Sequence, residues 1–321
     1  MKKIIFFLIL SSFLILAPAQ AITIFSPVLE MSAKPGQTQK GLLKLYNETG
    51  SDLVLTANLQ TFSADHDGQL KFFPLTAQDN FLRWFVLSQD NILIKAKQAM
   101  MIPFAVSVPA SAVPGGYNAV IFWSEKKDPA NNQSTVNISS QVGTLIFFKV
   151  AGDFKESGEI TDFFVSPVKK IFFGWPDKFL VQFENNGNIY LKPQAKIIIK
   201  NWFGQEKSLA AANGEMIVLP QTNRRFETSL RSSSQQNFFE KAIEESKFLA
   251  LGPCQATLNF DFGENNKQHL TRQIDLFIIP IHLLIVLFGF GLGLMVLFKI
   301  NYHVNKIKKG IKPSGVDEKS K

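Results

Sequence analysis

Apolar and polar residues alternate one by one along most of the chain between Ile22 and Asp275, which is the period of a β-strand. Such alternation places one side of each strand on a core and the other side in water. The clearest runs are 53–60, 102–108, 179–184, 195–200 and 258–262. Turn-forming pairs such as Pro35-Gly36 and Asp67-Gly68 separate the runs. Many short strands with frequent turns predict an all-β body of immunoglobulin-like sandwiches.

One stretch of this body departs from the strand period. Residues 232–251 contain FFEKAIEESK, where Phe239, Ala242 and Ile243 recur at helical spacing. Serines before the stretch are suited to cap a helix, and Gly252-Pro253 is suited to end it. We predict a short helix here that covers one end of a sandwich, with Glu244-Glu245 on its solvated side.

Two patterns in the sequence occur twice. KLYNETGSDLVL at 44–55 resembles VQFENNGNIYLK at 181–192, and GGYNAVIF at 115–122 resembles GPCQATLNF at 252–260. This internal repeat predicts two copies of one immunoglobulin-like sandwich, residues 22–153 and 154–275. We expect the glycine of each first pattern to supply the positive φ of a tight hairpin, and the glycine of each second pattern to allow a sharp entry into a central strand.

The two ends of the chain are not globular. Residues 1–21 combine Lys2-Lys3, an apolar run and Ala19-Gln20-Ala21, which is typical of a cleaved secretory signal. Residues 276–298 contain no Lys, Arg, Asp or Glu and are long enough for a transmembrane helix, which needs about 20 residues. The tail 299–321 is basic, with a net charge of +5. By the positive-inside tendency, the sequence predicts a single-pass plasma-membrane protein with its body extracellular and its tail cytoplasmic.

The candidate functional residues lie in and after this predicted span. Gly289 and Gly293 form a small-xxx-small pair, a pattern that lets two membrane helices pack closely. The tail lysines are expected to contact anionic lipid at the membrane surface. They are Lys299, Lys306, Lys308, Lys309 and Lys312.

The formal charge of +8 does not indicate a nucleic-acid partner, because the signal and the tail carry most of it and the ectodomain has a net charge of only +1. The single cysteine, Cys254, excludes an intrachain disulfide and is expected to be a buried apolar residue. His66 lies in SADHDGQL, which we interpret as a turn closing on Gly68. The sequence offers no catalytic, metal-binding or cofactor-binding motif, so we predict a protein that is not an enzyme. Among the aromatic residues, Trp202 and Phe203 are the best candidates for exposure.

The arrangement resembles one family of bacterial cell-surface proteins. A signal segment is followed by Pro-Gly-Gln-Thr at 35–38, a strand ending at Asn47, and a segment from Val108 to Ala119 that contains Pro-Gly-Gly-Tyr-Asn-Ala. A second β domain, a span and a basic tail follow. In this layout, and best in its first domain, the chain resembles the WxL-interacting proteins. The resemblance implies two immunoglobulin-like domains, the first binding peptidoglycan and the second binding host molecules.

These observations favour a non-enzymatic, membrane-anchored adhesion or binding protein of the cell surface. Its expected ligand is a cell-wall polymer or a secreted surface protein, bound at sheet edges and loops. An alternative is a chaperone-like or assembly module for a secreted protein, because pilus chaperones also consist of two immunoglobulin-like domains.

Overall fold

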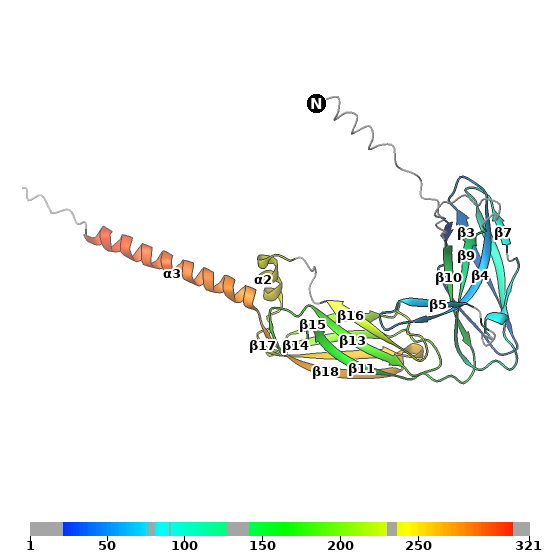
Figure 1. Cartoon of the computed structure of the whole chain (residues 1–321). Helices are drawn as coiled ribbons and strands as arrows, with labels where there is room; N and C mark the ends of the chain where they lie inside the picture. Colours follow the sequence, from blue (N-terminus) through cyan, green and yellow to red (C-terminus); the bar gives the residue numbers. More distant parts are fainter. Residues whose placement is uncertain are drawn as a thin grey trace, which may run out of the picture. The chain divides into compact units, whose positions relative to one another are not determined.

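The computed structural model describes residues 22–74, 76, 81–89, 91–126, 141–229 and 236–310. The predicted signal segment 1–21 and the tail residues 311–321 lie outside this range. The fold is all-β, with two tandem immunoglobulin-like sandwiches followed by one apolar helix (Figure 1). The chain forms two compact units. The first contains 1–158, 184–191 and 217–224, and the second contains 159–183, 192–216 and 225–321.

The first sandwich consists of two facing sheets. One sheet has the order β1-β3-β8-β6, with bounds Ile22–Ile24, Thr38–Asn47, Ala99–Ser107 and Phe85–Leu87. The other has the order β2-β10-β9-β4-β5, with bounds Val28–Ala33, Gln141–Val150, Gly115–Glu125, Leu53–Ala64 and Leu70–Pro74. Strand β7 (Asn91–Ile94) also pairs with β4, and the 3₁₀ helix η1 covers Phe81–Trp84. Trp123 and Phe148 are fully buried between the sheets.

The second sandwich repeats this plan. Its smaller sheet has the order β11-β13-β16, with bounds Gly158–Ser166, Lys178–Asn185 and Thr222–Ser229. Its larger sheet has the order β12-β18-β17-β14-β15, with bounds Ile171–Phe173, Gln268–Ile279, Gly252–Phe262, Gln194–Asn201 and Glu206–Asn213. The 3₁₀ helix η2 (Glu264–Asn266) connects β17 to β18. Phe183, Phe226 and Phe260 meet between the sheets, with ring centroids 4.5 Å apart for Phe183 and Phe260.

The internal repeat of the sequence corresponds to equivalent strands. The order β2-β10-β9-β4-β5 has the same plan as β12-β18-β17-β14-β15, and in both sheets the first pair is parallel. The patterns at 115–122 and 252–260 start β9 and β17, the central strands of these two sheets. Gly115 and Gly252 both have positive φ, +156° and +89°, as a sharp strand entry requires.

The other repeated pattern does not form a hairpin, so that expectation was wrong. Strand β3 lies in one sheet of the first sandwich and β4 in the other, and β13 and β14 are divided in the same way. Gly50 and Gly187 are not among the described glycines with positive φ. The element that both copies share is instead the asparagine that ends the first strand, Asn47 or Asn185, whose side chain is fully buried.

These two asparagines make equivalent contacts with the backbone, and Asn47 Oδ1 accepts in addition from the Thr49 hydroxyl at 2.6 Å. The Asn47 amide donates to the carbonyls of Ser51 at 2.8 Å and Ile94 at 3.1 Å, and its Oδ1 accepts from the Thr49 N–H at 2.9 Å. The Asn185 amide donates to Ile189 at 2.8 Å and Val218 at 3.0 Å, and its Oδ1 accepts from the Gly187 N–H at 2.9 Å. Each amide therefore satisfies backbone groups where the chain crosses from one sheet to the other.

The apolar segment at 276–298 is not helical throughout. Its first residues finish β18, where Leu276 and Ile278 are buried in the second sandwich and pair with Cys254 and Gly252. Pro280 lacks the N–H that would continue the ladder, and helix α3 runs over Ile281–Gly310. Hydropathy alone does not separate a buried strand from a membrane helix when one follows the other directly.

The predicted helix in the second domain is α2, over Phe238–Lys247. Asn237 and Glu240 form a capping box at its start, since each side chain bonds the other residue's backbone N–H at 2.9 Å. Its orientation differs from the expected one. Phe239 and Ile243 are exposed, whereas the acidic pair Glu244-Glu245, expected on the solvated side, is buried.

Candidate functional site

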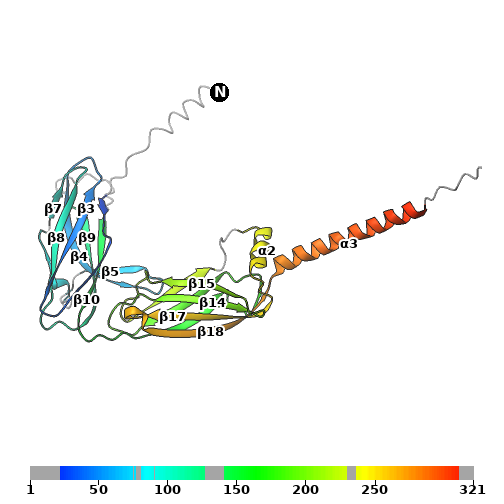
Figure 2. The same cartoon turned by 180° about the vertical axis from the view of Figure 1, so that it is seen from behind.

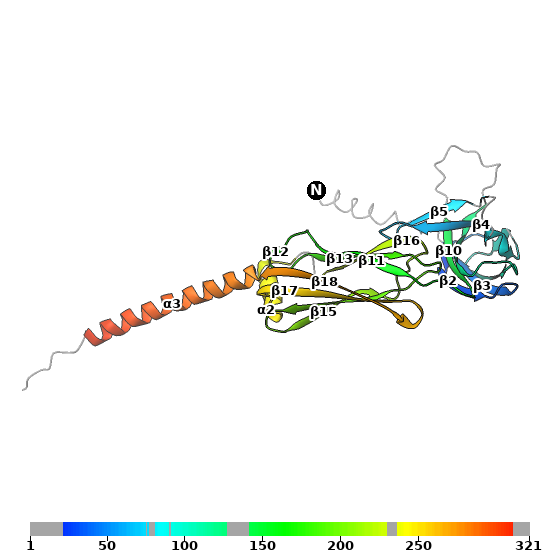
Figure 3. The same cartoon turned by 90° about the horizontal axis from the view of Figure 1, so that it is seen from below.

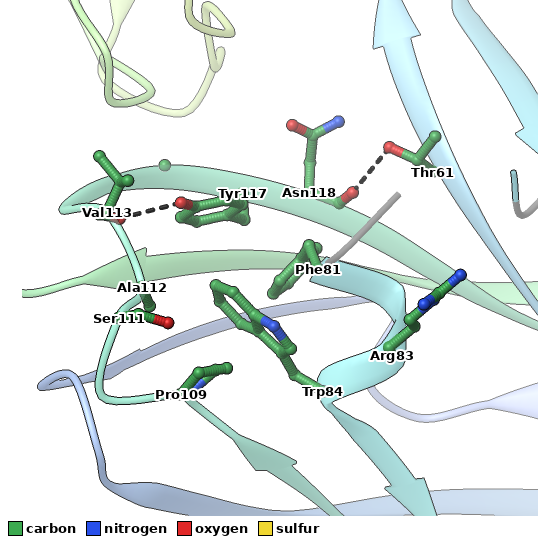
Figure 4. A pocket seen from close by; sticks show the side chains of 11 residues that line it. Thr61, Phe81, Arg83, Trp84, Pro109, Ser111, Ala112, Val113, Tyr117 and Asn118 are labelled. Carbon is green, nitrogen blue, oxygen red and sulfur yellow. Dashed lines mark hydrogen bonds between the residues drawn. The ribbon is translucent and has the colours of Figure 1, made fainter. Parts of the chain in front are cut away.

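The first sandwich carries an open pocket of about 700 Å³, shown in Figure 4. Its floor comes from η1 and from the start of β9, and one wall comes from the connection between β8 and β9. Phe81, Trp84 and Tyr117 supply aromatic surface, while Thr61, Arg83 and Ser111 supply polar groups. Ligand sites in proteins commonly combine apolar walls with a few placed polar groups in this way.

The aromatic rings of the pocket form one packed group. The Phe81 ring centroid lies 5.2 Å from Trp84 and 5.0 Å from Tyr117, and Trp84 lies 5.1 Å from Tyr117. Phe81 also contacts Phe148 of the core, at 5.8 Å between centroids. The ring contact with Phe148 ties η1 to the core, so close packing holds the ring group in place.

Hydrogen bonds hold the rim of the pocket. The Tyr117 hydroxyl donates to the Val113 carbonyl at 2.9 Å, which ties the β8–β9 connection to the ring group (Figure 4). The Thr61 hydroxyl donates to the Asn118 carbonyl at 3.0 Å and joins β4 to β9. A tyrosine hydroxyl is protonated and able to donate at neutral pH, since its usual pKa is about 10. Burial raises the pKa of Tyr117 above that value.

The sequence did not reveal this pocket. Phe81, Arg83 and Trp84 fall in FLRW, which has neither a motif nor a clear period. The glycine at the start of GGYNAVIF predicts a strand entry, and in the structure the same segment also brings Tyr117 to the pocket. Trp84 and Tyr117 are more than thirty positions apart in the sequence, and only the packing of η1 against β9 brings them together.

Other candidates from the sequence have the following positions. Trp202 and Phe203 are exposed as expected, whereas Trp84, Trp123 and Trp175 are buried. The segment containing His66 is a turn, since the Gly68 N–H donates to the Asp65 carbonyl at 2.9 Å and Gly68 has a φ of +78°. Among the residues that the structure describes, no group of three or more His, Cys, Asp or Glu side chains is arranged to hold a metal ion.

Helix α3 contains the remaining candidate residues. Gly289 and Gly293 are open, with nothing within 4 Å of a Cβ built on either. Lys299 and Lys306 are exposed on α3. Lys308 and Lys309 belong to the same helix, but their side chains are outside the described part, as is Lys312 altogether. The helix is long and apolar enough over Ile281–Lys306 to cross a membrane, and none of this stretch is buried.

Self-association through the two glycines stays a prediction, and it can be tested by substitution. We expect Gly289→Ile or Gly293→Ile to reduce crosslinked dimer of the full chain in membranes roughly tenfold, because a branched side chain separates the helix backbones. The control is Gly291→Ile, which lies about 200° around the helix from Gly289. Equal crosslinking in all three variants and the unaltered chain would exclude this glycine pair as the contact.

No protein-family model matches the chain, and no curated protein matches it. Several solved structures are similar in fold. They include the class 5 fimbriae chaperone CfaA, at 10% identity and a TM-score of 0.42, covering 81% of this chain and 100% of that one. A chaperone–tip adhesin complex of CFA/I fimbriae has 12% identity, a TM-score of 0.41 and coverage of 79% and 98%. The E. coli chaperone DraB has 10% identity, a TM-score of 0.36 and coverage of 80% and 97%. At these scores the similarities carry no argument about what this chain binds.

Proposed function

We propose that this chain is a non-enzymatic binding protein of the cell surface, anchored by α3 with its two sandwiches outside the membrane and its basic tail inside. Its ligand is an extracellular polymer of the cell wall, bound at the pocket of the first sandwich. The resemblance of the first domain to the WxL-interacting proteins points in the same direction. The observation that carries the proposal is the pocket itself, a packed aromatic surface bordered by hydrogen-bonding groups.

The chemistry of the pocket suits a sugar–peptide polymer. Tyr117 is the half-buried ring of the group, supported by the buried rings of Phe81 and Trp84. Its ring offers apolar area with a polar edge, which matches the apolar face of a sugar ring. Ser111 at the rim is exposed and offers a hydroxyl to sugar hydroxyls or to a peptide carboxylate. An open pocket accepts an internal segment of a long chain, whereas an enclosed cavity admits only small molecules.

The test is cosedimentation of the full chain, in detergent, with purified cell-wall material. We expect Ser111→Trp to weaken binding at least about tenfold, because the new ring fills the pocket; this corresponds to about 1.4 kcal/mol. The matched control is Ser88→Trp, which adds the same ring at an exposed serine that does not line the pocket. Absence of binding by the unaltered, folded chain would refute the proposed ligand, and unchanged binding by Ser111→Trp would refute the pocket.

A chaperone-like or assembly role is a second candidate, favoured by one edge of the first sandwich. Strand β10 pairs with β9 over Gln141–Val150, but with β2 only over Leu145–Val150. Among the described residues, 141–144 therefore have a strand neighbour on one side only. Such an edge is suited to accept a strand from another protein. Loss of solubility of a secreted protein when this chain is deleted, with copurification of the two, would favour this role over polymer binding.

A further inference from the structure

Three strands of the second sandwich bring distant residues to the end from which α3 leaves. Gly252 at the start of β17 pairs with Ile278 near the end of β18, and Cys254 pairs with Asn201 at the end of β14. The turn between β14 and β15 therefore lies at the same end as the start of α3, and Figure 3 shows β15, β17 and α2 near that start. We call this the span-proximal end of the sandwich.

Large apolar side chains are exposed at this end. Trp202 is 71% exposed and Phe203 55% exposed at the turn between β14 and β15, and Phe239 is 68% exposed on α2. Phe173, which precedes Gly174, is 68% exposed at the end of β12. These residues, together with Phe238 and Ile243 of α2, are named here the apolar collar. Exposed apolar groups gathered in one region of a protein indicate a surface that is covered in use.

At the opposite end of β17 and β18, the connection between the two strands is polar. The β17–β18 connection there reads GENNKQ over residues 263–268, with no apolar side chain. The two ends are about 35 Å apart, at 3.3–3.4 Å for each residue of β17. The collar is therefore a property of the span-proximal end and not of the second sandwich as a whole.

Helix α2 is fixed to the first turn of α3. The Glu245 carboxylate, 2% exposed, contacts His282 Nδ1 at 2.6 Å and accepts the Leu283 N–H at 2.8 Å. The Phe238 ring also packs on the His282 ring, with centroids 5.3 Å apart. Figures 1 and 2 show α2 beside the start of α3. These contacts hold the α2 side chains of the collar at the level where the apolar helix begins.

We propose that the apolar collar inserts into the outer surface of the membrane that α3 crosses, at the boundary between headgroups and acyl chains. This inference rests on the proposed membrane anchoring. Tryptophan and phenylalanine are favoured in this layer, and a short amphipathic helix with exposed phenylalanines lies in it with its apolar face buried about 5–10 Å. The occupant of the collar is lipid because the only described segment that leads away from this end is itself an apolar, span-length helix.

The test uses the full chain in vesicles of phosphatidylcholine and phosphatidylglycerol. A single cysteine replaces Phe239, Trp202 or, as the control at the polar end, Lys267, and an environment-sensitive fluorophore is attached to it. Cys254 is not labelled, because it is buried and burial raises the pKa of its thiol to about 11. All three replaced side chains are exposed, so we expect the circular dichroism of the variants to match that of the unaltered chain.

Lipids with a spin label near the headgroup should quench the fluorophore at positions 239 and 202 at least roughly threefold more strongly than at 267, because only these positions reach the interfacial layer. Equal quenching at all three positions, in a chain that resists alkaline extraction, would overturn the proposed insertion of the collar. The membrane anchoring by α3 would still stand. Blue-shifted emission at positions 239 and 202 without quenching by lipid would also overturn the membrane insertion of the collar. It would indicate that another protein covers these residues. Release of the chain by alkaline extraction would instead refute the membrane anchoring on which the collar depends.

Discussion

Replacing Asn185 or Asn47 by alanine is expected to lower the free energy of unfolding by about 3 kcal/mol. Each substitution removes two hydrogen bonds donated to backbone carbonyls and one accepted from a backbone N–H. The net loss is about 1 kcal/mol for each bond, and more where a buried partner remains unsatisfied. The asparagines are fully buried, so water does not replace the lost partners.

The measurement is urea unfolding of the full chain in detergent, followed by tryptophan fluorescence. With a slope near 2 kcal/mol per molar urea, the midpoint should fall by about 1.5 M. Asn47→Asp separates the two functions of the side chain, because a carboxylate keeps the acceptor and loses the donor; we expect it to be at least as damaging as alanine. The exposed Asn58→Ala serves as control, with a change below about 0.5 kcal/mol. A midpoint for Asn185→Ala equal to that of this control would contradict the role given to the buried amide.

Glu245→Ala is expected to release α2 from the start of α3. The Leu283 N–H belongs to the first turn of α3 and has no partner within that helix, and the carboxylate supplies both an acceptor and a negative charge at the positive end of the helix dipole. A hydrogen bond to a charged group contributes about 1.5–3 kcal/mol. Its loss should therefore increase amide hydrogen exchange within Phe238–Lys247 by roughly 10- to 100-fold, measured on the full chain by mass spectrometry.

Two further variants make this result specific. Glu245→Gln keeps one acceptor oxygen and the volume of the side chain, so its exchange should lie between that of the unaltered chain and that of the alanine variant. Lys247→Ala removes an exposed charge from the same helix and should leave exchange nearly unchanged. If Glu245→Ala exchanges no faster than Lys247→Ala, the carboxylate does not hold α2 in place.

The strand content followed from the sequence because β periodicity is a local signal. In the runs at 102–108 and 258–262, the alternate residues Phe104, Val106, Leu258 and Phe260 are buried as predicted. The internal repeat was also visible in the sequence, because equivalent strands of the two sandwiches begin with similar short stretches of residues. The error over Gly187 arose because a turn pattern does not reveal whether the next strand pairs with the previous one or crosses to the facing sheet.

Burial on α2 was not predictable from its own sequence. Helical spacing identified Phe239 and Ile243 as one apolar side, and apolar sides normally face a core. The buried side is instead the one with Glu245, because the orphan N–H groups at the start of α3 provide a partner for a carboxylate. That partner lies almost forty residues further along the chain, so no local window contains the information.

The sequence by itself determined the β-strands, their duplication, the short helix and the apolar segment after Asp275, because each depends on residue types that are neighbours along the chain. Only the tertiary structure decided that Trp84 and Tyr117 line one pocket, and that Trp202, Phe173 and Phe239 gather where α3 begins. The physical reason is strand register. Backbone hydrogen bonds between β14, β17 and β18 determine which strand ends lie side by side. A surface made from those ends cannot be predicted from the sequence of any one segment.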